Sequence, residues 1–133
     1  MEVIITAWAL DSYLELKRKK EFSEVDYKKT IRPAVLLLKD FSTMPSPKFS
    51  NNKFWSPATL SSLVIPSGFK MKWHNLGANK IQLRLPVGMM KESFLLHAYV
   101  KTDPKAEARE MAKFKTRLEL IRRGQFTECG RLS

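Results

Sequence analysis

The sequence predicts an α+β domain with an N-terminal strand and two helices, an antiparallel sheet of three to four strands, and a C-terminal helix. Two patterns predict this order. Apolar and polar residues alternate along three successive segments in the second half of the chain, as in half-buried strands. Apolar residues recur every three or four positions before and after those segments, as in amphipathic helices. At 133 residues and 44% hydrophobic content, we expect a single domain over residues 1–133, with its helices on one face of the sheet.

The first third of the chain is predicted to be mostly helical. Residues 2–6 are rich in β-branched side chains and are expected to form a strand. A helical apolar period begins at Trp8 and ends in a run of positive charge, which suits the last turn of a helix. Ser23 is placed to cap a second helix over residues 24–40, which Pro33 should kink or split.

A long loop is predicted between the second helix and the sheet. Residues 42–68 contain four prolines and several serines, which interrupt regular structure. We expect an insertion at about residues 43–67, anchored to the body of the domain by the aromatic residues Phe49, Phe54 and Trp55.

Three strands and a helix are predicted after this loop. The alternating segments that predict strands are residues 69–74, 80–87 and 93–101. Asp103 is placed to cap the last helix, with Pro104 at its first position and Gly124 at its end, before a short tail. The apolar residues of this helix form one stripe, made of Met111, Phe114, Leu118 and Ile121.

The chain carries a large excess of positive charge. Lys and Arg total 24 against 13 Asp and Glu, which gives a formal net charge of +11. Such a chain attracts polyanions, and its binding to them weakens as salt rises. Nucleic acid is the leading candidate, and an anionic membrane surface or an acidic protein are the alternatives.

Cysteine content and hydropathy narrow the class of protein. A single cysteine, Cys129, excludes an internal disulfide and a cysteine-based zinc site within one chain, which favours a reducing compartment. The first residues do not follow the pattern of a signal peptide, and no segment approaches the roughly 20 apolar residues of a membrane span. We therefore expect a cytoplasmic protein with no metal, no cofactor and no membrane partner.

The strongest motif lies where the last predicted strand meets the last helix, at residues 94–104, Phe-Leu-Leu-His-Ala-Tyr-Val-Lys-Thr-Asp-Pro. With the basic helix after it, the glycine-led strand from Gly68 and the arginine at Arg84, this segment resembles the HigB-like and phage-derived members of the RelE superfamily of bacterial toxins. The resemblance covers residues 68–123, and residues 1–42 only by element order. The chain differs from the family in its longer insertion, its single lysine at Lys101, and the lack of a tyrosine near the C-terminus.

This resemblance implies a RelE-like fold and the toxin of a type II toxin–antitoxin system. RelE-type enzymes cut messenger RNA, usually on the ribosome, by attack of a ribose 2′-hydroxyl on the adjacent phosphate, without a metal. The partners it implies are messenger RNA, the ribosome and a cognate antitoxin, expected to be a helix-turn-helix protein.

Such a reaction needs a proton acceptor, positive charge at the phosphate and a proton for the leaving oxygen. In a simple meander, the basic side chains of the three strands can share one side of the sheet. We expect Arg84 to stabilise the phosphate. Since clustered cations are easier to deprotonate, the predicted residues for proton transfer and substrate binding are Lys70, Lys72 and His74. The predicted RNA-binding residues are Lys101, Tyr99, His97 and Lys80.

Each assignment also has a purely structural interpretation. Alternating lysines are typical of any solvated sheet face, and His74 borders a turn. His97 lies in an apolar run, where a packed histidine is common, and half-buried tyrosines such as Tyr99 are frequent in sheets. The functional alternatives are a ParE-like toxin, which would inhibit DNA gyrase instead of cutting RNA, and a non-catalytic protein that binds RNA or the ribosome.

Overall fold

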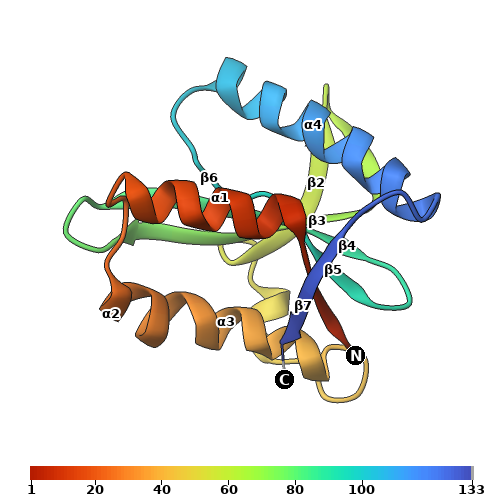
Figure 1. The fold of residues 1–133 in the computed structure, drawn as a ribbon, viewed down its shortest axis with the longest axis horizontal. Coiled ribbons are helices and arrows are strands. Elements are labelled where there is room, and N and C mark those ends of the chain that lie inside the picture. Colours follow the sequence, from red (N-terminus) through yellow and green to blue (C-terminus); the bar gives the residue numbers. More distant parts are fainter. Residues whose placement is uncertain (133) are drawn as a thin grey trace.

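The computed structural model describes residues 1–132 as a mixed α+β fold. A seven-stranded sheet forms its centre, and helices pack on both faces (Figure 1). The α+β class predicted from the sequence is confirmed. Two finer expectations are wrong, since the sheet has more than three to four strands and the helices cover two faces instead of one.

The strands lie in the order β2–β3–β4–β5–β1–β7, and β6 pairs with β4 beside β5. Neighbouring strands are antiparallel, except that β1 and β5 are parallel. The strands span Val3–Thr6 (β1), Trp55–Leu60 (β2), Leu63–Leu76 (β3), Ile81–Met89 (β4), Ser93–Leu95 (β5), Tyr99–Val100 (β6) and Glu128–Leu132 (β7).

The N-terminal strand leads directly into a helix, as the sequence predicts. β1 ends at Thr6, whose hydroxyl oxygen accepts a hydrogen bond from the Ala9 N–H (3.2 Å). This bond caps α1 (Ala7–Arg18). Lys17 and Arg18 lie in the last turn, where positive charge suits the helix dipole.

The second helical segment is continuous from residue 24 to residue 40 but changes its hydrogen-bond spacing. It comprises α2 (Glu24–Asp26), a π-helical turn (Tyr27–Ile31), α3 (Arg32–Leu36) and a 3₁₀ turn (Leu37–Asp40). Ser23 and Asp26 form a capping box at its start. The π-helical turn comes just before Pro33, which has no N–H to donate. The interruption predicted at Pro33 is therefore a change of helix type.

The segment predicted as a long loop contains regular structure, so that expectation is wrong. After a 3₁₀ turn at Pro47–Ser50, it includes β2 and the first part of β3. β2 can contain Pro57 because it is an edge strand. It pairs with β3 on one side only, so the N–H that proline lacks is not needed for a second neighbouring strand. The aromatic anchoring is as predicted. Trp55 stacks on Phe69 with ring centroids 5.0 Å apart, and Phe49 meets Trp55 edge-on at 5.0 Å.

Two further departures concern the last strands. The strand predicted over residues 93–101 is interrupted at residues 96–98, where the Ala98 N–H donates to Ser12 Oγ on α1 (2.8 Å). The tail expected after Gly124 contains β7, which pairs with β1. Both departures arise from contacts with the N-terminal segment, far away in the sequence.

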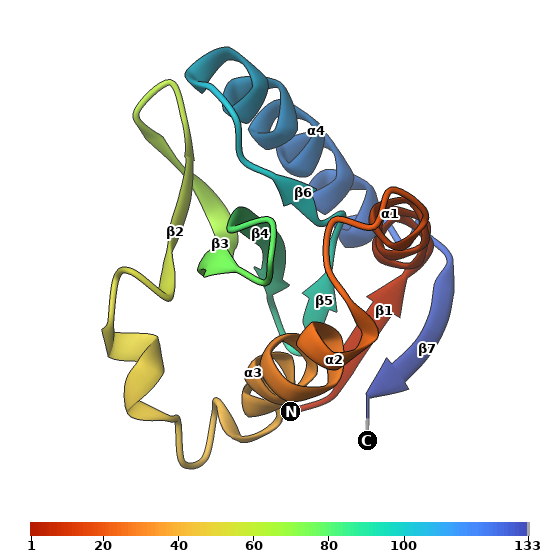
Figure 2. The ribbon, with the colours of Figure 1, turned by 90° about the vertical axis from the view of Figure 1, so that its left-hand side faces the viewer.

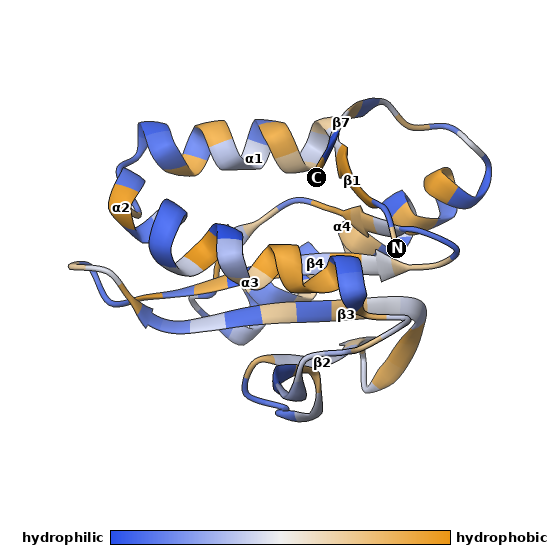
Figure 3. Ribbon diagram, turned by 90° about the horizontal axis from the view of Figure 1, so that it is seen from below, coloured by the Kyte–Doolittle hydropathy of each residue, from blue (hydrophilic) through white to orange (hydrophobic). Residues whose placement is uncertain are grey.

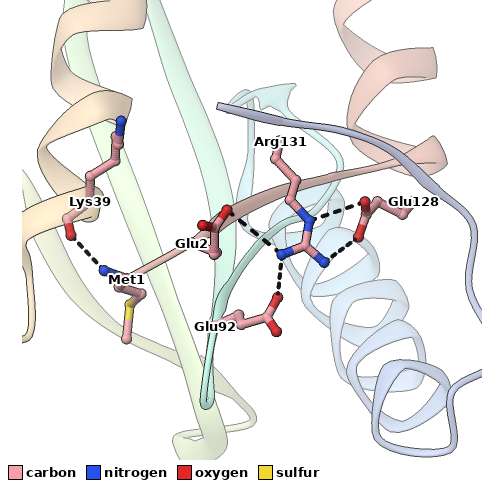
Figure 4. Close-up of polar contacts among 6 residues, drawn as sticks. All are labelled: Met1, Glu2, Lys39, Glu92, Glu128 and Arg131. Carbon is pink, nitrogen blue, oxygen red and sulfur yellow. Dashed lines mark hydrogen bonds and ion pairs between the residues drawn. The ribbon is translucent and has the colours of Figure 1, made fainter. Parts of the chain in front are cut away.

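Ion pairs of Arg131 connect β7 to the N-terminal segment and to the turn before β5 (Figure 4). Arg131 contacts three carboxylates, at 3.0 Å from Glu128, 3.4 Å from Glu92 and 3.6 Å from Glu2. The N-terminal ammonium donates to the Lys39 carbonyl oxygen at 2.8 Å. Because Arg131 is half-exposed, each of its ion pairs contributes at most about 1 kcal/mol.

The core has one layer on each side of the sheet. On one side, α1 and α3 pack against Met71, Trp73 and Leu83. Figure 3 shows apolar and polar residues alternating around these helices, as expected of helices that bury one side. On the other side, α4 (Pro104–Arg122) packs against Ile4 and Phe94 with the predicted stripe of Met111, Phe114, Leu118 and Ile121.

Candidate nucleic-acid interface

A row of polar side chains crosses the centre of the sheet on the side that faces α4. Lys72 of β3 is in register with Arg84 of β4, which is in register with Tyr99 of β6. Their neighbours Met71 and Trp73 belong to the opposite core layer, so alternation places the row on the α4 side. This set of side chains is called the basic row below, and its members are Lys70, Lys72, Arg84, Tyr99 and Lys101.

Arg84 is the most deeply placed cation of the basic row. Only 5% of its surface is exposed, and its Nη1 donates to the carbonyl oxygens of Trp73 and Leu83, each at 3.1 Å. Burial lowers the pKa of its guanidinium, but arginine remains charged at any physiological pH. The remaining donors, on Nε and Nη2, can bind an anion, since a guanidinium has five N–H groups.

Lys72 is surrounded by other positive charges. It is half-buried, and the pKa of its ammonium is lowered by that burial and by the charges of Lys70, Arg84 and Lys101. A lysine with a lowered pKa is neutral more often near neutral pH and can then accept a proton. This is the electrostatic effect that the sequence predicted for clustered cations.

The first turns of α4 place a carboxylate over the basic row. Glu107 Oε1 lies 2.7 Å from Lys70 Nζ, and the two side chains are 16% and 17% exposed. Burial alone would raise the pKa of Glu107, but the hydrogen bond from Lys70 and the nearby Tyr99 hydroxyl, with the charges of Lys70 and Lys101, hold it below its usual value. Burial raises the pKa of Tyr99, and the negative charge of Glu107 raises it further, so the buried hydroxyl stays protonated.

A groove of about 260 Å³ opens beside this carboxylate. It lies between the turn that joins β2 to β3 and the start of α4, and Lys101 and Glu107 line it together with Ser61. Figure 2 shows this β2–β3 hairpin and the first turns of α4 on the same side of the molecule. Solvent can therefore reach the basic row from its Lys101 end.

Two of the predicted site residues lie apart from the row. His74 follows Lys72 beyond an irregularity in the β3–β4 pairing, is exposed, and contacts the Lys53 carbonyl oxygen through Nε2 at 2.5 Å. Lys80 is exposed in the β3–β4 turn with a positive φ of 48°. Neither is among the charges that shift the pKa of Lys72. The simple meander expected from the sequence therefore brings together only part of the predicted set.

The two predicted aromatic contacts with RNA are buried. Tyr99 is 8% exposed and His97 is 6% exposed, so neither ring is free to stack on a base at the surface. His97 lies next to Glu110 of α4, with Nε2 2.8 Å from Oε2. Burial, with a contribution from Arg117, lowers the pKa of His97 and favours the neutral ring.

Sequence reasoning did not assign Glu107 and Glu110 to the site, although a signal for both was present. They lie four residues before Met111 and Phe114, so the helical period extends the buried stripe of α4 to both carboxylates. A carboxylate on the sheet-facing side of a helix, over a row of cations, is expected to pair with one of them.

An apolar cavity lies on the other face of the sheet. It encloses about 220 Å³ between α1, α3 and the strands, and Tyr13, Trp73 and Leu83 are among the residues that line it. Arg32 is the one charged side chain in its lining among residues 1–132. The cavity therefore offers an apolar contact surface but no acid–base chemistry.

Comparison of this chain with protein-family models, with curated proteins and with solved structures finds no match. Within residues 1–132, no group of three or more His, Cys, Asp or Glu side chains is arranged to hold a metal ion. No helix in that part of the chain is long and apolar enough to cross a membrane. The basic row and its carboxylate are thus the features from which a function can be argued.

Proposed function

We propose that the protein is the RelE-like toxin of a type II toxin–antitoxin system and cuts messenger RNA on the ribosome by metal-independent attack of a ribose 2′-hydroxyl. The observation that carries the proposal is the basic row, in which three strands align Lys72, Arg84 and Tyr99 with two further lysines beside them. The order of strand, helical segment, antiparallel strands and terminal helix also agrees with the resemblance of residues 94–104 to that family.

The chemistry proposed for the row uses one lysine as the base and another as the acid. Neutral Lys72 accepts the proton of the 2′-hydroxyl as its oxygen attacks phosphorus. Arg84 and Lys101 stabilise the negative charge that develops on the phosphate oxygens. The bond from phosphorus to the 5′-oxygen breaks, and Lys70 donates a proton to that oxygen. The products are a 2′,3′-cyclic phosphate and a 5′-hydroxyl.

In this scheme Glu107 is a positioning residue. Its contact of 2.7 Å with Lys70 holds the ammonium at the edge of the row. Its negative charge also raises the pKa of Lys72, against the lowering by the neighbouring cations. Glu107 therefore sets how strongly the row attracts phosphate and how readily Lys72 becomes neutral.

Expression in bacteria tests the proposal. The wild-type chain should stop growth and leave transcripts cut at translated positions. Lys72→Met should relieve both effects without unfolding the protein. The Lys72 side chain makes no hydrogen bond or ion pair within residues 1–132, and the bond from its backbone N–H to the Phe54 carbonyl oxygen (2.8 Å) is kept. Arg84→Ala should relieve them as well, and circular dichroism of the purified variants shows whether each remains folded. Toxicity that persists in both folded variants, with messages intact, contradicts the catalytic assignment.

The burial of Arg84 and the pairing of Lys70 with Glu107 favour one alternative, a non-catalytic or ParE-like toxin on the same fold. In that case the row stabilises the domain, and the toxin acts by binding gyrase, RNA or the ribosome. Growth arrest with a DNA-damage response and uncut messages would identify a ParE-like toxin. Salt-sensitive RNA binding without growth arrest would identify a binding protein.

The partner implied by either toxin is a cognate antitoxin, for which a small helix-turn-helix protein encoded beside this chain is the proposed candidate. Co-expression of that neighbour should restore growth and co-purify with the chain. A net charge of +11 favours an acidic partner surface.

A further inference from the structure

A second polar groove, of about 640 Å³, lies between α1 and α4 and borders the basic row at Tyr99. Its floor is the interrupted strand from His97 to Thr102. One wall is the side of α1 that carries Trp8 and Ser12, and the other is the side of α4 that carries Glu110. Its volume lies in the range of about 300–1,000 Å³ that is usual for small-ligand sites.

The floor of this groove carries a buried histidine with one unpartnered ring nitrogen. His97 is 6% exposed, and its Nδ1 has no hydrogen-bond partner within the described residues. Nε2 is occupied by Glu110, whose Oε2 lies 2.8 Å away. Buried polar groups without partners are rare in folded proteins, so this ring indicates a ligand that completes its hydrogen bonds.

The walls supply a carboxylate and a flat aromatic surface. Glu110 is 22% exposed, and Lys113 contacts its second oxygen at 3.4 Å, which leaves lone pairs free on both oxygens. The guanidinium of Arg117 lies over the Trp8 ring at 5.2 Å. The charged residues lining the groove nearly balance, with Asp11, Glu15, Glu21 and Glu110 against Lys19, Lys113 and Arg117. A neutral, planar ligand suits this groove better than a phosphate does.

We propose that this groove binds an unpaired nucleobase of the RNA strand and favours bases that carry an exocyclic amino group. The proposal rests on the RNA function proposed above. Adenine, cytosine and guanine donate an exocyclic amino hydrogen that Glu110 accepts. The one ring donor of uracil, N3–H, lies between two carbonyl oxygens that the carboxylate repels. With Nε2–H directed at Glu110, Nδ1 of the neutral His97 ring is left as an acceptor for an N–H of the same base.

The groove and the basic row are adjacent, so a single strand can reach both. Tyr99 is in register with Arg84 on one side, and its ring centroid is 6.1 Å from that of His97 on the other. A strand whose phosphate lies at Arg84 and Lys101 can therefore place a neighbouring base in the groove. Phosphate contacts of this kind position the strand, and the base contact distinguishes its sequence.

The test uses the full chain and fluorescent 2′-O-methyl hexanucleotides of adenine, cytosine or uracil, which a 2′-hydroxyl mechanism cannot cleave. Anisotropy at several salt concentrations gives the affinity and its salt slope. We expect the adenine and cytosine hexamers to bind about 10-fold more tightly than the uracil hexamer, the scale of one good base contact. Glu110→Gln should reduce this preference to about 2-fold or less and leave the salt slope unchanged, because the phosphate contacts remain.

Glu119→Gln is the matched control, since Glu119 lies on the same helix, is 51% exposed and is outside the groove. It should keep the full preference. Salt-dependent binding of all three hexamers with equal affinity, unchanged by Glu110→Gln, overturns the base groove and leaves RNA binding intact. No binding of any hexamer at low salt overturns the base groove, whereas the proposed function is decided separately by the growth and cleavage assay in bacteria.

Discussion

Glu107→Gln should destabilise the fold by about 3 kcal/mol, because Glu107 compensates the buried end of the basic row. Its carboxylate lies 2.7 Å from Lys70 Nζ, and the two side chains are only 16% and 17% exposed. Removing one partner of a buried ion pair costs about 3–5 kcal/mol, since the other charge stays buried without compensation. The lower end applies here because both groups keep some contact with solvent. A loss of this size lowers the Tm by roughly 10 °C in a domain of this length.

The effect should depend on pH in a defined direction. The pKa of Glu107 in the folded protein lies below its ordinary value of 4.5, since the hydrogen bond from Lys70, the nearby Tyr99 hydroxyl and the charges of Lys70 and Lys101 together outweigh the effect of burial. A carboxyl group whose pKa is depressed by folding stabilises the fold above its unfolded pKa, and this stability is lost as pH falls through the folded pKa. The free energy of unfolding of the wild type should therefore exceed that of the variant by the full amount at neutral pH, and by less below pH 4.5.

Urea unfolding followed by tryptophan fluorescence, at neutral pH and below pH 4.5, measures both effects. Glu119→Gln is again the control, because its ion pairs with Arg122 and Arg123 are exposed and are worth at most about 1 kcal/mol. Equal losses in the two variants, or a Glu107→Gln loss that does not change with pH, would refute the buried ion pair.

Three further results are expected. Lys101→Gln removes a positive charge that lowers the pKa of Lys72, so the pKa of Lys72 should rise and the rising limb of the plot of cleavage rate against pH should move to higher pH. A limb that does not move argues against Lys72 as the base. Gly68→Ala should cost about 1–3 kcal/mol in urea unfolding, because its new Cβ would lie 2.8 Å from Phe114 Cε2 in the core. Ser23→Ala should cost about 1 kcal/mol in the same assay by removing the capping box, and a change near zero would show that the second helical segment is held by packing alone.

The elements that the sequence predicts correctly are those with local causes. Asp103 and Pro104 start α4 through capping and a preset φ, both properties of neighbouring residues. The alternation around Met71 and Trp73 places Lys72 on the opposite face, and the same period in β4 brings Arg84 beside it. Part of the candidate site therefore follows from strand periodicity.

The elements that the sequence misses depend on distant contacts. β7 has no alternating pattern and becomes a strand only because β1 offers it an edge. β2 contains Pro57, which argues against a strand until its place at the edge of the sheet is known. The helices cover both faces because Ile4 and Phe94 expose apolar side chains on the face that also carries the cations. Burial of Tyr99 and His97 follows from the position of α4, which no local pattern specifies.

The most direct test of the central claim is the chemistry of the cut RNA ends. Purified protein is added to ribosomes carrying messenger RNA, and the new ends are mapped and their chemical type is determined. We expect 2′,3′-cyclic phosphates and 5′-hydroxyls, the ends that attack by the 2′-hydroxyl leaves. They should be lost in Lys72→Met and retained in Lys28→Met, which changes an exposed lysine outside the row. Intact messages, or cleavage that survives Lys72→Met in a folded protein, would contradict the account.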